Sequence, residues 1–325
     1  MKKCAVIAGN GPSLAQIDYS RLPKDYKLFR CNQFYLEEAY YLGRHIDFVF
    51  FVKWAMLENY YTMQNLINRG EYSCDSIWCP GNRDDHMAAC FPALQFGSEC
   101  VRNLREMFIF LNFWGLYEGV GTTSGTYMCV MAAALGYEEL YLAGFDLYYG
   151  DNYYAFGVDR PNLLKVNPRV ASPSYDGGYG GHAREFDLQV LDFLTKKYSV
   201  KLYSLCPTSP LSAHFDLAPD VGNSFVVEKK GRDSLSDMLI PKNEAYLKYG
   251  KNPPDHEKQK RQERRRDRIK DNLYYRIFID LLRLPGDVFY YAKKKFALGG
   301  GGGGQLALTI KNINHNLQAI NQQTI

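Results

Sequence analysis

The sequence predicts an α/β fold in which helices cover both faces of one mostly parallel sheet. Three observations lead to this fold class. Short apolar segments of strand length alternate with longer segments of helical periodicity. The 325 residues, 46% apolar and 23% charged, can bury a sizeable core, which excludes global disorder. The eight cysteines form no CxxC pair, which favours reduced, buried thiols over a zinc or disulfide framework.

In the first half of the chain, short apolar runs predict strands at 4–8, 26–31, 46–52 and 76–79. A helix is expected between the last two strands, because apolar side chains there recur at helical spacing. These side chains are Trp54, Leu57, Tyr61 and Leu66. Residues 80–112 have a less regular pattern, with helical spacing at 101–111. The first half therefore supplies four strands and at least one long helix.

The second half continues the alternation. Residues 126–135 are apolar and rich in Ala and Met, so they predict a buried helix that Gly136 ends. A strand is expected at 140–143, a helix at 185–198 and a strand at 200–205. The elements form a single Rossmann-like core from residues 1–147 and 183–250. Sheets of this kind bind ligands beyond the carboxyl ends of their strands, where the strand order reverses.

Three segments lie outside this core. Residues 148–182 are rich in Gly, Tyr and Pro and have no period, which is typical of a lid or binding loop. Residues 251–298 form a charged tail with an amphipathic helical pattern. Residues 299–325 begin with a glycine linker and continue as an Asn- and Gln-rich end.

The basic charge belongs to the tail. Residues 1–250 have a net charge of −4, whereas residues 251–295 have a net charge of +7. A basic amphipathic segment with aromatic residues favours contact with an anionic membrane through residues 269–295. A helix packed on the core is the alternative for that segment. Nucleic-acid binding is disfavoured, because acidic residues interrupt the basic run and the core is acidic.

Hydropathy gives no sign of a membrane-spanning helix, since apolar runs of about 18 residues are absent. The apolar run behind the basic residues Lys2 and Lys3 is too short for a signal peptide. We therefore expect a cytoplasmic protein that binds peripherally to the inner face of the cytoplasmic membrane.

The first candidate site is the run Gly-Asn-Gly-Pro-Ser at 9–13, directly after the first strand. Backbone N–H groups at a helix start favour an anion. The dinucleotide fingerprint fails, because its third glycine position holds Leu14 and the second strand ends at Asn32, not an acid. Asn10 and Asn32 follow different strands and could reach one ligand; a glycine turn and an Asn cap are the alternative.

Two further runs stand at element boundaries. Gly-Thr-Thr-Ser-Gly at 121–125 opens the buried helix, and its three hydroxyls exceed what a helix cap needs, which favours a phosphate cradle. Ala-Gly-Phe-Asp-Leu-Tyr at 143–148 ends a strand. Asp146 in this run lacks a paired carboxylate, so a turn or cap role is favoured over metal binding.

His182 lies at the end of the Gly- and Tyr-rich loop. An imidazole titrates near neutral pH and can accept a proton from a hydroxyl group, which makes His182 a candidate general base. An exposed loop histidine without a catalytic role is the alternative.

Taken together, these motifs resemble the bacterial lipooligosaccharide sialyltransferases of glycosyltransferase family 42, over about residues 1–295. The matching segments are 7–13, 29–35, 123–125, 141–146, Tyr179-x-x-His182 and 280–285. The resemblance implies inverting transfer of sialic acid from CMP-sialic acid to a terminal galactose or sialic acid. It also implies that no metal or cofactor is required and that the chain forms a homo-oligomer, a tetramer.

The resemblance assigns roles to individual residues. His182 matches the general base, and Tyr148 and Tyr154 match the tyrosines that hydrogen-bond the departing phosphate. Substrate contacts are expected at Asn10, Gly11, Ser13, Asn32, Thr123, Ser124, Gly144, Phe145 and Tyr179. Neutral tyrosine hydroxyls and helix N-terminal amides can meet the growing negative charge without a metal.

The chain departs from the family pattern at two positions. Gly121 stands where some relatives have Arg, which leaves the acceptor open. Val52, followed by Lys53, stands where they have Asn, which leaves one donor contact open. A catalytically weak nucleotide-sugar-binding protein and a transferase for another activated sugar are therefore the alternatives.

Overall fold

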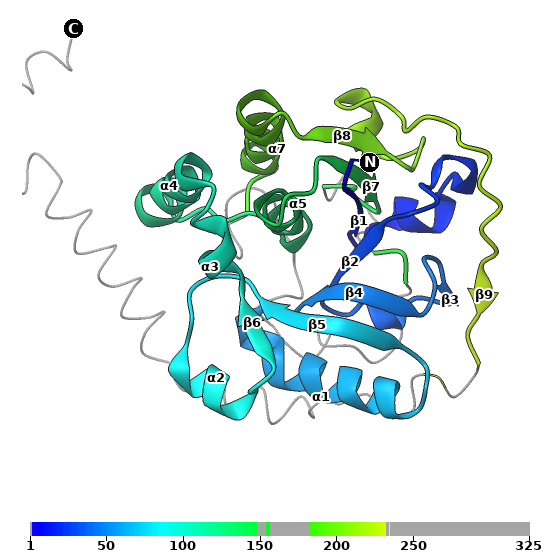
Figure 1. The fold of residues 1–325 in the computed structure, drawn as a ribbon, viewed down its shortest axis with the longest axis horizontal. Helices are drawn as coiled ribbons and strands as arrows, with labels where there is room; N and C mark the ends of the chain where they lie inside the picture. Colours follow the sequence, from blue (N-terminus) through cyan, green and yellow to red (C-terminus); the bar gives the residue numbers. More distant parts are fainter. Residues whose placement is uncertain (1, 148–153, 157–181, 232–233, 235–325) are drawn as a thin grey trace, which may run out of the picture. The chain divides into compact units, whose positions relative to one another are not determined.

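The computed structural model describes residues 2–147, 154–156, 182–231 and 234 (Figure 1). Contacts divide the chain into two compact units, Met1–Asn243 and Glu244–Ile325, and the described residues all belong to the first. The predicted tail at 251–298, the end at 299–325 and most of the lid at 148–182 lie outside the described residues. Their assignments stay predictions.

A seven-stranded sheet, parallel throughout, forms the centre of the described residues, in the order β6-β5-β4-β2-β1-β7-β8. This confirms the predicted α/β class. The strands are β1 (Cys4–Ala8), β2 (Lys27–Cys31), β4 (His45–Phe50), β5 (Ser73–Cys79), β6 (Leu94–Phe96), β7 (Glu139–Ala143) and β8 (Lys201–Ser204). A separate antiparallel pair joins β3 (Ala39–Tyr40) to β9 (Glu228–Lys229).

The strand order reverses at β1. After β1 the chain adds β2, β4, β5 and β6 on one side, and then returns to place β7 and β8 on the other. The connections that leave the carboxyl ends of β1 and β7 therefore depart in opposite directions. Open α/β sheets bind ligands at this point.

Helices pack on both faces of the sheet (Figure 1). Helix α1 covers one face with Met56, Met63 and Leu66, while α5 and α7 pack on the other. The strand side chains alternate accordingly, so that Val6 joins one core cluster and Ile7 the other. The helices are α1 (Met56–Asn68), α2 (Asp85–Cys90), α3 (Gly97–Val101), α4 (Arg105–Phe113), α5 (Ser124–Ala134) and α7 (Arg184–Tyr198).

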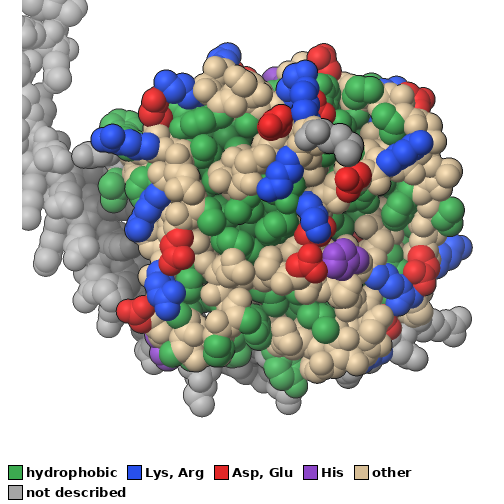
Figure 2. Space-filling view, in the orientation of Figure 1, with side chains coloured by type: hydrophobic (Ala, Val, Ile, Leu, Met, Phe, Trp, Pro, Cys, Tyr) green, Lys and Arg blue, Asp and Glu red, His purple; other side chains and the backbone are tan. Residues whose placement is uncertain are grey.

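Short single-turn helices fill several connections. They are 3-10 turns at Pro12–Gln16, Tyr19–Arg21, Phe34–Leu36, Lys53–Ala55 and Pro210–Ala213, and a π-helical turn at Trp114–Glu118. None of the described helices combines the length and apolarity needed to span a bilayer. Figure 2 shows basic and acidic side chains interspersed over one face of the molecule, with apolar side chains between them.

Helix α5 is buried on nearly all sides, as its composition predicts. Met128, Cys129 and Val130 are fully buried, because the helix lies between the sheet and its neighbours α3 and α7. Thr123 caps its start by accepting the Thr126 N–H, and Gly136 follows its end with a φ of 82°. The left-handed conformation at Gly136 confirms that glycine ends this helix.

Candidate active site

The turns after β1 and β7 lie in direct backbone contact. The Gly9 N–H donates to the Ala143 carbonyl at 2.9 Å, and the Gly11 N–H donates to the Gly144 carbonyl at 2.9 Å. A Cβ on Gly9 would lie 2.5 Å from the Gly144 oxygen, and Gly144 itself has a φ of 64°. Both glycines are therefore required by the close approach of the two turns.

Ser13 is buried and directs both of its donors at Asp146. The Ser13 N–H and hydroxyl lie 3.0 Å and 2.9 Å from the same Asp146 oxygen. The Asp146 carboxylate thus accepts from donors of this turn, which is a five-residue 3-10 helix. Asp146 contacts a turn 133 residues away, which differs from the local turn or cap role that the sequence favoured, and an anionic ligand at 9–13 stays a prediction.

Burial raises the pKa of Asp146, and the two bonds from Ser13 oppose that shift. Phe145 is buried beside Gly125, where an added Cβ would lie 2.9 Å from the phenyl ring. The observed contacts of Gly11, Ser13 and Phe145 are thus internal, and their direct contact with substrate stays a prediction.

Asn32 links three elements at the carboxyl edge of the sheet. Its N–H donates to the Phe50 carbonyl at 2.8 Å, at the end of β4. Its side-chain oxygen accepts the Val52 N–H at 3.1 Å, and its side-chain nitrogen donates to the Ser124 hydroxyl at 3.1 Å. Asn32 has a φ of 53°. Left-handed backbone at a residue other than glycine is concentrated at functional sites.

Asn10 lies beside this group. Its side-chain nitrogen donates to the Cys31 carbonyl at 3.0 Å, next to Asn32. Its side-chain oxygen is buried and has no hydrogen-bond partner among the described residues. An unsatisfied buried oxygen costs about 1–3 kcal/mol, which a bound ligand donor would recover. The structure therefore brings Asn10, Asn32 and Ser124 together, as the sequence predicted.

Tyr154 belongs to a short described segment that reaches the same turn. The Ala155 N–H donates to the Asn10 carbonyl at 2.8 Å. Tyr154 is partly buried and stacks on Phe156, with ring centroids 5.1 Å apart. This places Tyr154 next in sequence to a residue bonded to Asn10. Tyr148 and Tyr179 lie outside the described residues, so their roles stay predictions.

His182 is held by the backbone before α5. Its Nδ1 lies 2.9 Å from the Gly121 carbonyl oxygen, and the two residues form a parallel β-bridge. A carbonyl oxygen only accepts hydrogen bonds, so Nδ1 carries the proton of the neutral ring and Nε2 carries the lone pair. Arg184 donates to the Leu147 carbonyl at 3.1 Å, which fixes the start of α7 beside the turn after β7.

The sequence analysis missed Asp187, a fully buried carboxylate in the first turn of α7. Asp187 accepts both the N–H and the hydroxyl of Thr123. The sequence does indicate that Asp187 is buried, because it falls on the apolar face of its helix with Val190, Leu191 and Leu194. Acidic residues are rarely fully buried unless they are paired, so this placement indicates a specific role.

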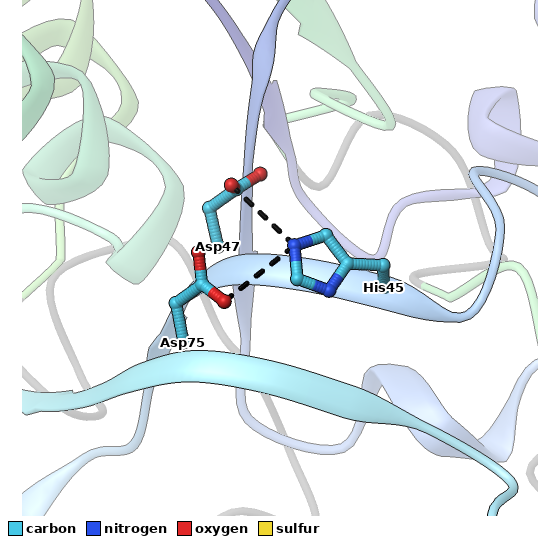
Figure 3. Close-up of side chains that lie close together, drawn as sticks. All are labelled: His45, Asp47 and Asp75. Atoms are coloured by element: carbon cyan, nitrogen blue, oxygen red, sulfur yellow. Dashed lines mark ion pairs between the residues drawn. The ribbon is translucent and has the colours of Figure 1, made fainter.

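One group of three potential metal ligands occurs within the described part of the chain (Figure 3). His45 Nε2 lies 3.6 Å from oxygens of both Asp47 and Asp75. Lys27 pairs with both carboxylates, and the Leu28 N–H donates to Asp47 at 2.7 Å. His45, Asp47 and Asp75 lie within the first three positions of β4 and β5, so the group lies at the edge opposite Asn32. We interpret it as an ion-pair cluster whose cation is Lys27.

Cys74 and Cys79 lie five positions apart in the sequence and are both free, but they have poor properties as zinc ligands. Burial raises the pKa of each thiol to about 11. Zinc binds the thiolate, which such burial disfavours.

The comparisons with known proteins decide the family. The model of the alpha-2,3-sialyltransferase (CST-I) family matches residues 3–295, which is most of the chain. The chain belongs to this sialyltransferase family. It is therefore a glycosyltransferase, as the resemblance of its motifs implied.

Solved structures of the family agree. The monofunctional alpha-2,3-sialyltransferase Cst-I of Campylobacter jejuni is 36% identical, with a TM-score of 0.69 over 79% of this chain and 95% of that one. CstII of Campylobacter jejuni, in complex with the substrate analogue CMP-3FNeuAc, is 41% identical, with a TM-score of 0.68 over 78% and 100%. A sialyltransferase CST-II bound to a trisaccharide acceptor and CMP is 39% identical, with a TM-score of 0.65 over 77% and 100%.

The two departures from the family pattern have different consequences in the fold. Gly121 contacts His182 through its carbonyl, a contact that any residue could make. Val52 likewise donates its N–H to Asn32, but its side chain offers no polar atom. The exposed Lys53 beside it pairs with Asp84. Both departures therefore remove a polar side chain, and the one at Val52 lies beside Asn32 in the predicted donor site.

Proposed function

We propose that this sialyltransferase moves sialic acid from CMP-sialic acid to a terminal galactose or sialic acid of lipooligosaccharide, with inversion and without a metal ion. The observation that carries the proposal is the orientation of His182, whose Nδ1 is bonded to Gly121 and whose Nε2 carries the lone pair. The relatives bound to CMP, to CMP-3FNeuAc and to a trisaccharide acceptor support the substrate classes.

The donor is bound by the asparagines and by the start of α5. The unsatisfied oxygen of Asn10 accepts a hydrogen bond from the nucleotide sugar, and Asn32 and Ser124 lie adjacent to it. The positive end of the α5 dipole lies at Ser124 and favours the phosphate. The hydroxyls of Tyr148 and Tyr154 donate to the departing phosphate oxygens.

The transfer is a single displacement. The acceptor oxygen forms a bond to the anomeric carbon while the bond from that carbon to the phosphate oxygen breaks. CMP leaves with the electron pair, and Nε2 of His182 takes the proton of the acceptor hydroxyl. General-base assistance of this kind contributes about 10²–10⁴-fold to the rate. Attack opposite the leaving group inverts the anomeric carbon.

The tail and the surface determine where the enzyme works. We propose peripheral binding to the inner face of the cytoplasmic membrane through residues 269–295. We also propose a homo-oligomer, a tetramer by family resemblance. An exposed apolar stripe supports self-association, since Ile109, Phe113 and Leu116 recur at helical spacing and are all more than half exposed.

A transfer assay tests the proposed function. The full chain is incubated with CMP-sialic acid, a lactoside and EDTA, and we expect CMP release together with a sialylated product. His182→Ala should abolish transfer while CMP binding, measured by calorimetry, persists. His45→Ala, at the opposite edge of the sheet, is the matched control and should remain active. A His182→Ala variant with full activity would remove the proposed base.

Val52 favours a second candidate. A protein that has lost a polar donor contact would bind a nucleotide sugar weakly or prefer another activated sugar. CMP binding without turnover across a panel of acceptors would support the weak binder. Turnover with a different nucleotide sugar in a donor panel would support the other transferase.

A further inference from the structure

Asp187 is a buried carboxylate that the proposed chemistry does not use. It is fully buried in α7, and one of its oxygens accepts the Thr123 N–H at 2.9 Å and the Thr123 hydroxyl at 3.2 Å. Burying a carboxylate is costly unless hydrogen bonds compensate for the lost water. The Asp187 contacts therefore join α7 firmly to the residue that caps α5.

The segment before α5 and the start of α7 are joined at a second point, through Gly121, which precedes Thr123 by two residues. Gly121 and His182 form a parallel bridge, and Nδ1 of His182 donates to the Gly121 carbonyl. Residues 121–123 and 182–187 are thus connected at two points. The Gly121 carbonyl that orients the imidazole is two residues from Thr123, so a shift of Thr123 moves that carbonyl as well.

Thr123 also connects this pair of segments to the asparagines. Its hydroxyl oxygen accepts the Thr126 N–H and so begins α5. Ser124, the next residue, accepts a hydrogen bond from Asn32. One anchored residue therefore sets the positions of both the Gly121 carbonyl and the Ser124 hydroxyl.

We propose that Asp187 is the positioning residue that keeps His182 protonated on Nδ1, with its Nε2 lone pair available to the acceptor hydroxyl. The inference rests on the proposed function for its catalytic meaning. In the absence of Asp187 the Thr123 N–H loses its partner, the segment 121–124 shifts, and the Gly121 carbonyl no longer selects one tautomer.

The test is nitrogen NMR of the full chain labelled at histidine, with His182→Ala identifying the signals of His182. In the unmodified protein, at a pH at which the His182 ring is neutral, we expect Nδ1 to be protonated and Nε2 to be unprotonated. Asp187→Ala removes the acceptor of both Thr123 donors, and it should give mixed tautomers at His182 and lower kcat about 10- to 100-fold, a loss typical of a misplaced catalytic group. The donor KM should change less, since Asp187 touches no substrate.

Two matched variants separate positioning from general destabilisation. Asp192→Ala removes an exposed carboxylate of the same helix, which pairs with Lys196, and should leave the tautomer and kcat unchanged. Thr123→Val removes the hydroxyl contact with Asp187 and keeps the N–H contact. It should therefore shift the His182 tautomer in the same direction as Asp187→Ala, to a smaller extent, including where Asp187→Ala fails to fold.

The outcomes distinguish the two proposals. A folded Asp187→Ala protein with the original His182 tautomer and kcat overturns the positioning role. An Nε2-protonated ring in the unmodified protein overturns it as well, even where transfer is efficient. A tautomer change in Asp187→Ala alongside an unmodified protein that transfers no sialic acid supports the positioning role and rejects the proposed function.

Discussion

At the scale of single residues, the buried carboxylate of Asp146 should make the stability of the fold depend on pH. Burial raises its pKa above the ordinary value of 3.8. As pH rises from that value, the unfolded chain loses this proton before the folded chain does. The free energy of unfolding therefore falls with pH until the folded carboxyl has also ionised, and it changes little from this group thereafter.

Asp146→Asn tests this sign. The amide oxygen can still accept both donors of Ser13, while the variant has no charge to bury. We expect the melting temperature of the variant, relative to the unmodified protein, to increase as pH is raised from 4 towards neutrality. Calorimetry across that range provides the measurement. A relative melting temperature that decreases with pH would mean that the ionised carboxylate stabilises the fold.

The proximity of two site residues could be predicted from the sequence where each residue directly follows a strand. Asn10 and Asn32 follow two strands that pair in parallel, so their proximity followed from the pattern of strands. The roles of Ser13 and Asp187 did not follow, because each depends on a partner 133 or 64 residues away. No local pattern indicates such long-range pairs.

At the scale of elements, the long periodic segments were predicted well and the short ones were not. Helix α5 begins at Ser124 and α7 ends at Tyr198, close to the expected limits. The three-residue strand β6 and the short helices α2 and α3 were missed. Elements of three to six residues have too few positions for a period to emerge, and they form because neighbouring strands and helices cover them.

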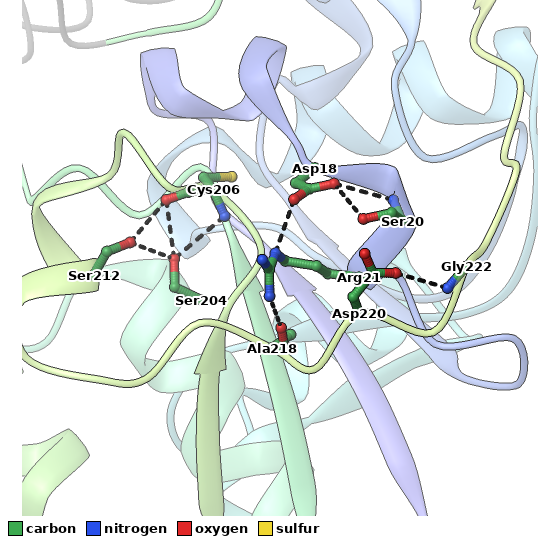
Figure 4. A network of polar contacts seen from close by, with 9 residues as sticks. All are labelled: Asp18, Ser20, Arg21, Ser204, Cys206, Ser212, Ala218, Asp220 and Gly222. Carbon is green, nitrogen blue, oxygen red and sulfur yellow. Dashed lines mark hydrogen bonds and ion pairs between the residues drawn. The ribbon is translucent and has the colours of Figure 1, made fainter.

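The loop after β8 shows how an irregular element is fixed by side-chain bonds (Figure 4). The hydroxyl of Ser212 donates to the Cys206 carbonyl at 2.8 Å, and Arg21 donates to Asp18 and to the Ala218 carbonyl. The loop is thereby attached both to itself and to the turn at Tyr19–Arg21. Such a network supports the carboxyl edge of the sheet without regular secondary structure.

The segment 154–156 carries a prediction for the reaction. Because the Ala155 N–H donates to the Asn10 carbonyl, Tyr154 is held near the residues proposed to bind the nucleotide sugar. Its hydroxyl is proposed to donate to the departing phosphate there. Tyr154→Phe should lower kcat about tenfold or more and change the donor KM less, since the charge on the phosphate develops late. Steady-state kinetics with CMP-sialic acid provide the measurement.

The matched control for Tyr154 is Tyr61→Phe, which removes the hydroxyl of a half-exposed tyrosine in α1. This control should leave both kinetic constants unchanged. A Tyr154→Phe variant in which KM rises and kcat is constant would show that the hydroxyl binds the ground state.

At the scale of the whole molecule, the fold class followed from alternation alone, because a parallel sheet requires helical crossovers between its strands. The reversal of strand order at β1 places Asn10, Asn32 and Ser124 at one edge. Periodicity could not reveal the strand order itself, which depends on which edge each new strand joins. The motifs at 9–13, 29–35 and 141–146 coincide with the ends of β1, β2 and β7, and strand ends meet at that edge, so the predicted site residues Asn10 and Asn32 lie together there.

The exposed apolar stripe on α4 and the following turn carries the last prediction. Leu116 is 79% exposed, and the side chains of Ile109 and Phe113 precede it at helical spacing. An apolar stripe of this size is costly in water and is typical of a protein interface. Leu116→Glu should therefore lower the mass measured by light scattering towards that of one chain. Val226→Glu, at an 83% exposed apolar residue away from the stripe, should leave the mass unchanged. An equal mass for both variants and the unmodified protein would contradict a contact through this stripe, since a buried glutamate in the contact would oppose association.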